Sequence, residues 1–248
     1  MIKSLSIIIP FYNEKERIQS SLIEIKNFIK KNRKIKIEVL FVNDGSTDET
    51  EKNIINFSKK IKLNSRNYRI LKLVKNTGKG GALKFGVSKM KNNWALTTDM
   101  DLSVPLEQLI QWFNRDYINK SGNEIYFGSR EMDDSIVKTK IYRKILGVFF
   151  RFFSNLFLNV DLKDSQCGFK LYKKEVAKKI FSKMKSLRFE HDLEIALIAK
   201  SYNYEVIELP VEWEHKPGSK LNIFYDPIKM FFGIIKIWYE KILTKRRS

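Results

Sequence analysis

Short apolar runs alternate with amphipathic helical segments through the first hundred residues. Runs rich in Ile, Val and Leu predict strands over 5–10, 38–43, 69–74 and 94–98. Apolar residues spaced three and four apart predict a helix over 18–29, which we expect to follow Asn13 as its N-cap. Ser46 and Glu49 form a capping box that predicts a second helix, and 80–90 predicts a third. Three successive βα units predict a parallel sheet with a nucleotide-binding half.

The pattern changes after residue 101. Pro105 suits the first turn of a helix that runs to Asn114. The remaining segments predict strands over 124–129, 169–172 and 205–211 and helices over 140–160, 174–184 and 190–201. We find no internal repeat, low-complexity linker or heptad array, so the chain is predicted to form one α/β domain.

The chain is strongly basic. It has 248 residues with 47 Lys and Arg against 28 Asp and Glu, a formal charge of +19. Abundant Lys, Asn and Ile also fit an AT-rich coding sequence, which accounts for part of the excess. The rest indicates a polyanionic partner: nucleic acid, an anionic membrane surface or phosphorylated substrates.

The single cysteine and the short apolar runs bear on the cellular compartment of the protein. Cys167 has no partner for an intrachain disulfide, so the chain fits a reducing compartment and is not a cysteine-rich zinc module. We expect it to be a small packed residue. No run of about 18 uncharged apolar residues predicts a spanning helix, and the N-terminal apolar run is too short for a signal peptide.

Acidic side chains follow three of the predicted strands. Glu14 follows the first, Asp44 the second, and Asp99 and Asp101 the fourth. Ligands of open α/β sheets bind at the carboxyl ends of strands, so we expect these residues to meet at one edge. Two aspartates spaced i and i+2 can bind one divalent cation through hard oxygen ligands. The alternative is a pair of solvated loop aspartates.

A glycine-rich turn precedes the third predicted helix. In the sequence NTGKGG at 76–81, backbone N–H groups and Lys79 could meet phosphate groups. The spacing is not that of a P-loop, and G-x-G-x-x-G is absent.

Four of these motifs together carry a family resemblance. The sequences IIIPFYNE at 7–14, VNDGSTD at 42–48, NTGKG at 76–80 and DMD at 99–101 resemble the family-2 glycosyltransferases of GT-A fold. Farther on, GSR at 128–130, DSQCGFKL at 164–171 and GSK at 218–220 resemble the dolichyl-phosphate β-glucosyltransferase branch. The resemblance extends from about residue 5 to residue 221.

The resemblance implies a fold and an activity. The fold is α/β of GT-A type, with a Rossmann-like, mostly parallel sheet flanked by helices. Residues 1–101 would form a nucleotide-sugar-binding half and 102–222 an acceptor-binding half of one domain, followed by a C-terminal amphipathic basic helix over 223–248. The implied activity is inverting transfer of a hexose, with glucose from UDP-glucose as the first choice, to a polyprenyl or dolichyl phosphate.

The resemblance also implies a donor site. Asp99 and Asp101 would hold Mg²⁺ or Mn²⁺, and Asp44 would accept a hydrogen bond from the uracil N–H. Met100, Leu102 and Ser103 depart from the family pattern, so the third metal ligand is unassigned. The implied nucleotide-sugar residues are Pro10, Tyr12, Glu14, Asp44, Lys79, Asp99, Met100 and Asp101.

The acceptor site is implied in the same way. Arg130, Gln166 and Lys220 would face the acceptor phosphate or the transferring sugar. A phosphate monoester has a second pKa of about 6, so the acceptor is mostly dianionic at neutral pH and needs cations more than a general base. Asp101, Asp192 and Arg130 are the implied catalytic residues.

Asp192 has two interpretations. It aligns with an aspartate of a Phe-Asp-Val-Glu motif, with His191 where Phe is expected. Alternatively, Glu190 and Asp192 only favour the positive N-terminus of the following helix. We expect His191 and His215 to be surface or partly packed residues.

Two segments have the pattern of helices that lie on a membrane. In 142–160 and 226–243, narrow basic or polar stripes stand opposite broad apolar faces. We expect Phe149 and Phe153 to face lipid, which would place the protein on the cytoplasmic face of a membrane as a peripheral enzyme. The alternative is that both are core helices.

Two rival functions remain open at this point. One is a family-2 transferase with another donor, such as GDP-mannose, or a soluble or polysaccharide acceptor. The other is a nucleic-acid-binding protein, which the dispersed Lys residues disfavour because such proteins concentrate basic and stacking aromatic residues. The sequence does not determine the oligomeric state.

Overall fold

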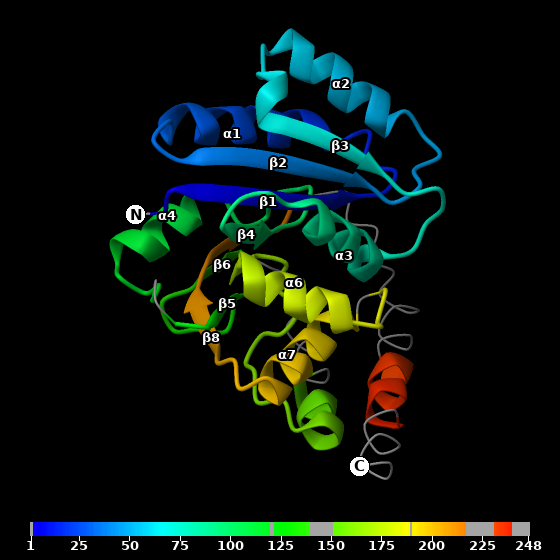
Figure 1. The fold of residues 1–248 in the computed structure, drawn as a ribbon, viewed down its shortest axis with the longest axis vertical. Coiled ribbons are helices and arrows are strands. Elements are labelled where there is room, and N and C mark those ends of the chain that lie inside the picture. The colour runs from blue at the N-terminus through cyan, green and yellow to red at the C-terminus, as the bar shows by residue number, and fades with distance from the viewer. Residues whose placement is uncertain (1, 120–121, 139–150, 189, 217–230, 240–248) are drawn as a thin grey trace.

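A seven-stranded sheet forms the centre of the protein in the computed structural model (Figure 1). The structure describes residues 2–119, 122–138, 151–188, 190–216 and 231–239. The strand order in the large sheet is β3-β2-β1-β4-β7-β5-β8, and β6 pairs with β9 in a second sheet. The strands are β1 (Ser4–Phe11), β2 (Lys36–Asn43), β3 (Tyr68–Lys72), β4 (Trp94–Thr97), β5 (Ile125–Ser129), β6 (Ile136–Lys138), β7 (Lys170–Lys173), β8 (Val206–Pro210) and β9 (Glu212–Glu214).

The first half of the sheet is parallel, as predicted. β1 pairs with β2 along its whole length, whereas its pairing with β4 covers only Leu5 to Ile8. Pro10 therefore lies beyond the end of the β4 pairing, where a residue without an N–H costs no ladder hydrogen bond on that side. The carboxyl ends of β1, β2 and β4 consequently lie at one edge.

The second half is mixed. β7 runs antiparallel to both β4 and β5, and β5 pairs in parallel with β8. The central sheet is thus mostly parallel with one antiparallel strand inserted. The small sheet of β6 and β9 was not predicted, because strands of three residues carry too little periodicity to detect.

Helices cover both faces of the sheet. One apolar cluster includes Leu22 of α1, Ile54 of α2 and Trp112 of α4, and the opposite cluster includes Leu83 of α3, Ile180 of α6 and Leu193 of α7. The helices are α1 (Ile18–Lys31), α2 (Thr50–Lys60), α3 (Lys79–Lys89), α4 (Glu107–Asn114), α6 (Lys174–Lys183) and α7 (His191–Ser201), with a short 3-10 turn η1 (Ser65–Asn67). These layers make an α/β/α sandwich.

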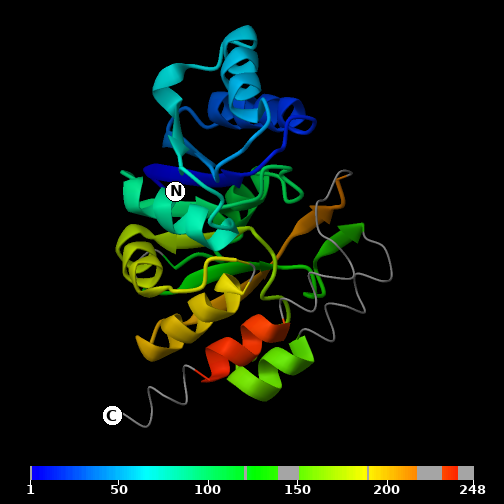
Figure 2. The same cartoon turned by 90° about the vertical axis from the view of Figure 1, so that its right-hand side faces the viewer.

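Two further helical segments lie next to α7. Residues 151–158 and 231–239 are helical and lie side by side, with the rings of Phe157 and Trp238 5.8 Å apart (Figure 2). The predicted helix over 140–160 is confirmed for its final part, and its earlier residues lie outside the described ones. No helix in the described part of the chain is both long and apolar enough to cross a membrane.

The two predicted helix caps are wrong in an informative way. α1 begins after Arg17 and α2 after Glu49, and neither Asn13 nor Ser46 caps a helix. Asn13 has φ 54°, its side chain accepts hydrogen bonds from the N–H groups of Thr47 and Asp48, and its own N–H donates to Ser46 Oγ at 3.0 Å. The cap-forming residue types instead join the loops after β1 and β2, because short polar side chains also bond to backbone groups outside helices.

Candidate active site

The loop after β2 is held by Asp44. Its buried carboxylate accepts hydrogen bonds from Thr77 N (2.7 Å), Thr77 Oγ1 (2.9 Å) and Gly78 N (2.8 Å). Gly78 has φ 95° and a Cβ there would collide with the Leu187 carbonyl, so this position requires glycine. Asp44 therefore fixes the glycine-rich turn before α3, and any contact with a nucleobase would be additional to these bonds.

Arg17 connects two carboxylates that the sequence predicted to lie at one edge. Its Nε and Nη2 donate to the two oxygens of Glu14, both at 2.7 Å, and its Nη1 donates to Asp101 Oδ2 at 3.1 Å. The other oxygen of Asp101 accepts bonds from Ser103 N (3.0 Å) and Ser103 Oγ (2.9 Å). The predicted convergence of strand-end carboxylates is confirmed, with an arginine as their common counter-ion.

Asp99 pairs with Lys79 across the same edge. Lys79 Nζ lies 2.6 Å from Asp99 Oδ1, and the Asp99 side chain is 44% exposed. Burial alone would raise the pKa of Asp99, but the Lys79 ammonium outweighs it and holds that pKa below its usual value. Burial likewise opposes the charge of Lys79, and Asp99 and Asp192 raise the Lys79 pKa to about 12. Both groups are charged at neutral pH.

A buried ionic cluster lies beneath this edge. Lys170 is 1% exposed, and its Nζ donates to the Cys167 carbonyl (2.6 Å) and to Asp192 Oδ1 (2.5 Å) while it stands 4.6 Å from the ring centre of Phe127. Asp192 is in the first turn of α7 and is 4% exposed. Asp192 thus lies in the first turn of a helix, as one interpretation expects, and it also has a specific buried counter-ion.

The expectation that His191 is a surface or partly packed residue is wrong. It is 1% exposed, its Nδ1 lies 2.6 Å from the Arg188 carbonyl and its Nε2 lies 3.3 Å from Asp192 Oδ1. Burial lowers the pKa of His191, and Lys79 and Lys170 lower it further against the opposing effect of Asp192. His191 is therefore a neutral, buried member of the cluster.

Arg130 lies in a second ion pair. Its Nε and Nη2 donate to Asp164 Oδ2 (2.6 Å) and Oδ1 (2.9 Å), and its guanidinium stands 5.6 Å from the ring centre of Trp213. Burial opposes the charge on each partner, yet Arg130 holds the pKa of Asp164 below its usual value and Asp164 raises that of Arg130. Arg130 follows β5 directly, so the second half of the sheet supplies this cation.

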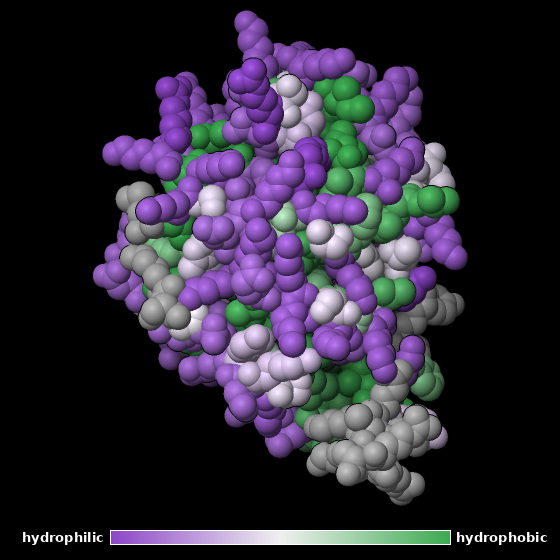
Figure 3. Space-filling view, viewed as in Figure 1, coloured by the Kyte–Doolittle hydropathy of each residue, from purple (hydrophilic) through white to green (hydrophobic). Residues whose placement is uncertain are grey.

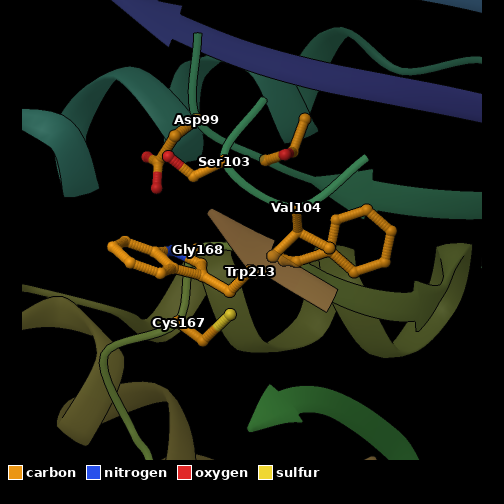
Figure 4. A pocket seen from close by; sticks show the side chains of 8 residues that line it. Asp99, Ser103, Val104, Cys167, Gly168 and Trp213 are labelled. Carbon is orange, nitrogen blue, oxygen red and sulfur yellow. The ribbon is translucent and has the colours of Figure 1, made fainter. Parts of the chain in front are cut away.

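A small pocket lies close to both sets of charges, because Asp99 and Trp213, the ring beside Arg130, both line it. Figure 4 shows the carboxylate of Asp99 above the indole of Trp213, with Cys167 below that ring. A Cβ on Gly168 would collide with the carboxylate of Asp99, so this glycine allows the two loops to approach closely. The pocket is lined by Thr98, Asp99, Ser103, Val104, Cys167, Gly168, Phe169 and Trp213.

The other predicted site residues are placed as follows. Tyr12 is 37% exposed, Pro10 is half-buried and Met100 is buried within the core. Gln166 follows Asp164 in the same turn, and its Nε2 is buried with no hydrogen-bond partner among the described residues. Lys220 lies outside the described residues. Cys167 is buried as expected, and burial raises the pKa of its thiol to about 11.

Four residues of the site were not singled out from the sequence: Arg17, Asp164, Lys170 and Trp213. Asp164 and Lys170 lie within the quoted DSQCGFKL sequence, and a lysine among apolar residues of a predicted strand was an available signal. Arg17 and Trp213 carried none, because each acquires its role from residues far away in the sequence.

Curated relatives match nearly the whole chain. A dolichyl-phosphate beta-glucosyltransferase from Dictyostelium discoideum is 34% identical over 251 residues, which cover 96% of this chain and 75% of that protein. Proteins of the same name from Homo sapiens and Saccharomyces cerevisiae are each 31% identical, covering 92% and 94% of this chain and 72% and 73% of theirs.

Solved structures share the fold. A glucosyl-3-phosphoglycerate synthase from Mycobacterium tuberculosis in complex with UDP matches with a TM-score of 0.64 and 15% identity, covering 95% of this chain and 80% of that one. A mannosyl-3-phosphoglycerate synthase from Rubrobacter xylanophilus matches with a TM-score of 0.62 and 13% identity, covering 100% and 76%.

The family profile agrees with the motifs and with the relatives. The profile described as glycosyl transferase family 2 matches residues 6–181, which include every strand end that carries the clustered carboxylates. The chain therefore belongs to glycosyl transferase family 2 and is a glycosyltransferase.

Proposed function

We propose that this enzyme transfers glucose from UDP-glucose to a dolichyl or other polyprenyl phosphate and forms a β-linked lipid-phosphate sugar. The observation that carries the proposal is the likeness to dolichyl-phosphate beta-glucosyltransferases, at 31–34% identity over more than nine-tenths of the chain. The site is consistent with it, because one pocket is lined both by Asp99 and by Trp213, the ring beside which the Arg130 guanidinium stands.

The donor half would bind the nucleotide sugar and a divalent cation. Asp99 offers a partly exposed carboxylate, and Asp101 offers oxygens now bonded to Arg17 and Ser103. These hard oxygen donors suit Mg²⁺ or Mn²⁺, and a related fold has been solved with Mn²⁺ and UDP-glucose. Within the described residues no third His, Cys, Asp or Glu joins them. When bound, the cation would neutralise charge on the departing nucleoside diphosphate.

Lys79 would serve the same diphosphate. Its ammonium stands beside Asp99 at the N-terminus of α3, where backbone N–H groups and the helix dipole also favour an anion. Asp44 would position the turn that holds Lys79, and Glu14, Tyr12, Pro10 and Met100 would complete the nucleotide-sugar site.

The acceptor half would bind the lipid phosphate through cations. A phosphate monoester is mostly dianionic at neutral pH and attacks the anomeric carbon without a strong base. In-line displacement of an α-linked donor then gives a β-linked product. Arg130, with Gln166 and Lys220, would orient the phosphate, and Asp192, which accepts a hydrogen bond from Lys170, would orient the sugar or acceptor.

A lipid acceptor requires contact with a membrane, and one face of the protein suits it. Figure 3 shows apolar surface gathered at the lower right, over the region where α7 and residues 231–239 lie. Phe152, Leu156, Phe232, Trp238 and Tyr239 of the two helical segments are 37–64% exposed. Exposed Lys200 and Lys236 lie on α7 and on the second segment, in keeping with an anionic surface. We propose peripheral attachment to the cytoplasmic face of a membrane through this apolar face.

The helical segments do not present the face that the sequence suggested. Phe153 is half-buried, 5.0 Å from the ring of Phe231, and belongs to the core side of its helix. Its neighbours Phe152 and Leu156 are the exposed residues. Phe149 lies outside the described residues. Each helix is therefore packed on one side and apolar on the other.

The test is a matrix of donors and acceptors assayed for nucleoside diphosphate release. UDP-glucose and GDP-mannose would each be combined with dolichyl phosphate and with 3-phosphoglycerate, the soluble type of acceptor that the structural neighbours suggest. The proposal predicts release only with UDP-glucose and dolichyl phosphate. Equal release with 3-phosphoglycerate would replace it with a soluble-acceptor function.

A further inference from the structure

We propose that Asp164 is a positioning residue for the acceptor phosphate, which acts by fixing the guanidinium of Arg130 with its free edge available to the phosphate. The proposal rests on the proposed function, because it takes the acceptor to be a phosphate. The negative charge of Asp164 would by itself repel the phosphate. The proposal nevertheless gives this buried carboxylate a role in binding it.

Some N–H groups of the Arg130 guanidinium donate to Asp164, and others have no partner among the described residues. Nε and Nη2 donate side by side to the two oxygens of Asp164, which occupies one edge of the planar group. The ring of Trp213 covers a face at 5.6 Å. Nη1 has no hydrogen-bond partner among the residues that the structure describes, so the end of the fork, Nη1 with the second hydrogen of Nη2, remains for a ligand.

Asp164 is itself held rigidly. Its side chain is 5% exposed and also accepts hydrogen bonds from Arg130 N (3.0 Å) and Gln166 N (3.1 Å). The carboxylate of Glu208 on β8 accepts bonds from the backbone N–H groups of Lys163 and Asp164, both at 2.7 Å. Glu208 thus anchors only the backbone of this turn to the sheet, and the direction of the Arg130 fork is set by the Asp164 carboxylate itself.

The Arg130 guanidinium lies next to Trp213, which forms part of the wall of the pocket that contains Asp99. Trp213, on which the guanidinium rests, lines that pocket together with Cys167, and Cys167 is close enough to Arg130 and Asp164 for both charges to act on the pKa of its thiol. Two parallel N–H groups of an arginine match two oxygens of a phosphate. A phosphate bound there would enter the pocket opposite the donor edge.

The charge balance explains why orientation matters. The Arg130–Asp164 pair has no net charge, so its attraction for an anion depends on which end faces the anion. A guanidinium released from Asp164 keeps its charge but loses its fixed direction, and a displacement of about 1 Å at a reacting group can cost about a hundredfold in rate. Removal of Asp164 is therefore expected to weaken acceptor use even though it removes a repulsive charge.

The test uses Asp164→Asn, Arg130→Ala, the double variant and Glu208→Gln in the full chain. We expect Asp164→Asn to raise the acceptor KM by about tenfold or more and to leave the dissociation constant of UDP-glucose unchanged. Because Asp164 would act only through Arg130, adding Asp164→Asn to Arg130→Ala should cause no further loss. Glu208→Gln is the matched control, since it disturbs the same turn without touching the guanidinium, and it should change the acceptor KM much less for a similar drop in melting temperature.

Several results would overturn the inference. These are an unchanged or lower acceptor KM in Asp164→Asn, additive losses in the double variant, or an equal effect of Glu208→Gln at equal stability. If Asp164→Asn fails to fold, Asp164→Glu replaces it, since it keeps the charge but displaces the carboxylate, and it too should raise the acceptor KM. Failure of the proposed function is distinct, because the unaltered enzyme would then show no turnover that depends on lipid phosphate.

Discussion

The two halves of the sheet hold their charged residues in different ways. At the donor edge, carboxylates after β1, β2 and β4 are bonded to loop backbone or to Arg17 and Lys79, and several remain partly exposed. In the second half, proposed to bind the acceptor, Lys170 and Arg130 are each paired with an aspartate that is at least nine-tenths buried. The edge proposed to bind the donor is thus a set of loops joined by polar contacts, whereas the second half is built on buried ion pairs.

The difference in burial indicates how substitutions in each half of the sheet would affect activity and stability. A surface carboxylate can be replaced with little effect on folding, because water replaces its lost partners. A buried pair that loses one partner leaves an uncompensated charge and destabilises the protein strongly. Substitutions of the partly exposed Asp99 and Asp101 should therefore mainly reduce activity, and substitutions in the buried pairs should reduce stability as well.

The largest effect is expected at Asp101. Asp101→Ala removes a proposed metal ligand, so transfer should fall by about a hundredfold or more while the melting temperature changes little. Turnover and Mn²⁺ binding would be measured together. Asp116→Asn is the control, because Asp116 is exposed and its φ of 54° suits asparagine. Activity that resists both Asp101→Ala and a chelator would refute the metal role.

The next effect concerns stability. Lys170→Met leaves Asp192 buried without its counter-ion and should lower the free energy of unfolding by about 3–5 kcal/mol. Adding Asp192→Asn removes the stranded charge and should recover a large part of that loss. Urea unfolding of the three proteins measures both quantities. A loss below about 1 kcal/mol in Lys170→Met would mean that the pair is not effectively buried.

Two adjacent phenylalanines separate membrane contact from packing. Phe152→Glu should release the protein from anionic liposomes and keep the melting temperature, because Phe152 is 61% exposed. Phe153→Glu should instead lower the melting temperature, because Phe153 packs against Phe231. Sedimentation with liposomes and thermal melting provide the two readouts. Unchanged liposome binding by Phe152→Glu would contradict the proposed apolar face.

The smallest effect is a pH dependence from His191. Its folded-state pKa is lowered below the ordinary 6.5, so the unfolded chain binds more protons as pH falls. Stability should therefore be complete well above pH 6.5 and decline, by at most about 1.4 kcal/mol per pH unit, as pH falls through and below it. His191→Gln should flatten this part of the melting profile. Identical profiles for the unaltered protein and His191→Gln would contradict a buried neutral histidine.

The sequence predicted the donor edge better than the acceptor half. Parallel βα units bring strand ends together by topology, so Glu14, Asp44 and Asp101 could be placed without knowing any contact. The strands over 94–98 and 169–172 were also found, but their antiparallel pairing was not, because a crossover within the sheet leaves no periodic trace.

The remaining site residues depend on distant partners. Arg17 meets Asp101 across 84 positions, and Lys170 meets Asp192 across 22. Periodicity predicted that 140–160 has an apolar face but could not divide that face between core and surface, since Phe152 and Phe153 are equally apolar. The expectation that His191 is a surface or partly packed residue failed for a similar reason, because His191 begins a helix that buries residues on several sides.

The most direct test of the division between the two halves is the kinetics of Arg130→Ala with UDP-glucose and a polyprenyl phosphate. If Arg130 binds the acceptor phosphate, the variant should lose acceptor use by a factor that corresponds to about 2–5 kcal/mol, and its dissociation constant for UDP-glucose should stay that of the unaltered enzyme. Measurement well below the melting temperature separates this effect from the loss of the Asp164 pair. Equal losses for donor and acceptor would contradict the account, since Arg130 would then serve the nucleotide or the fold.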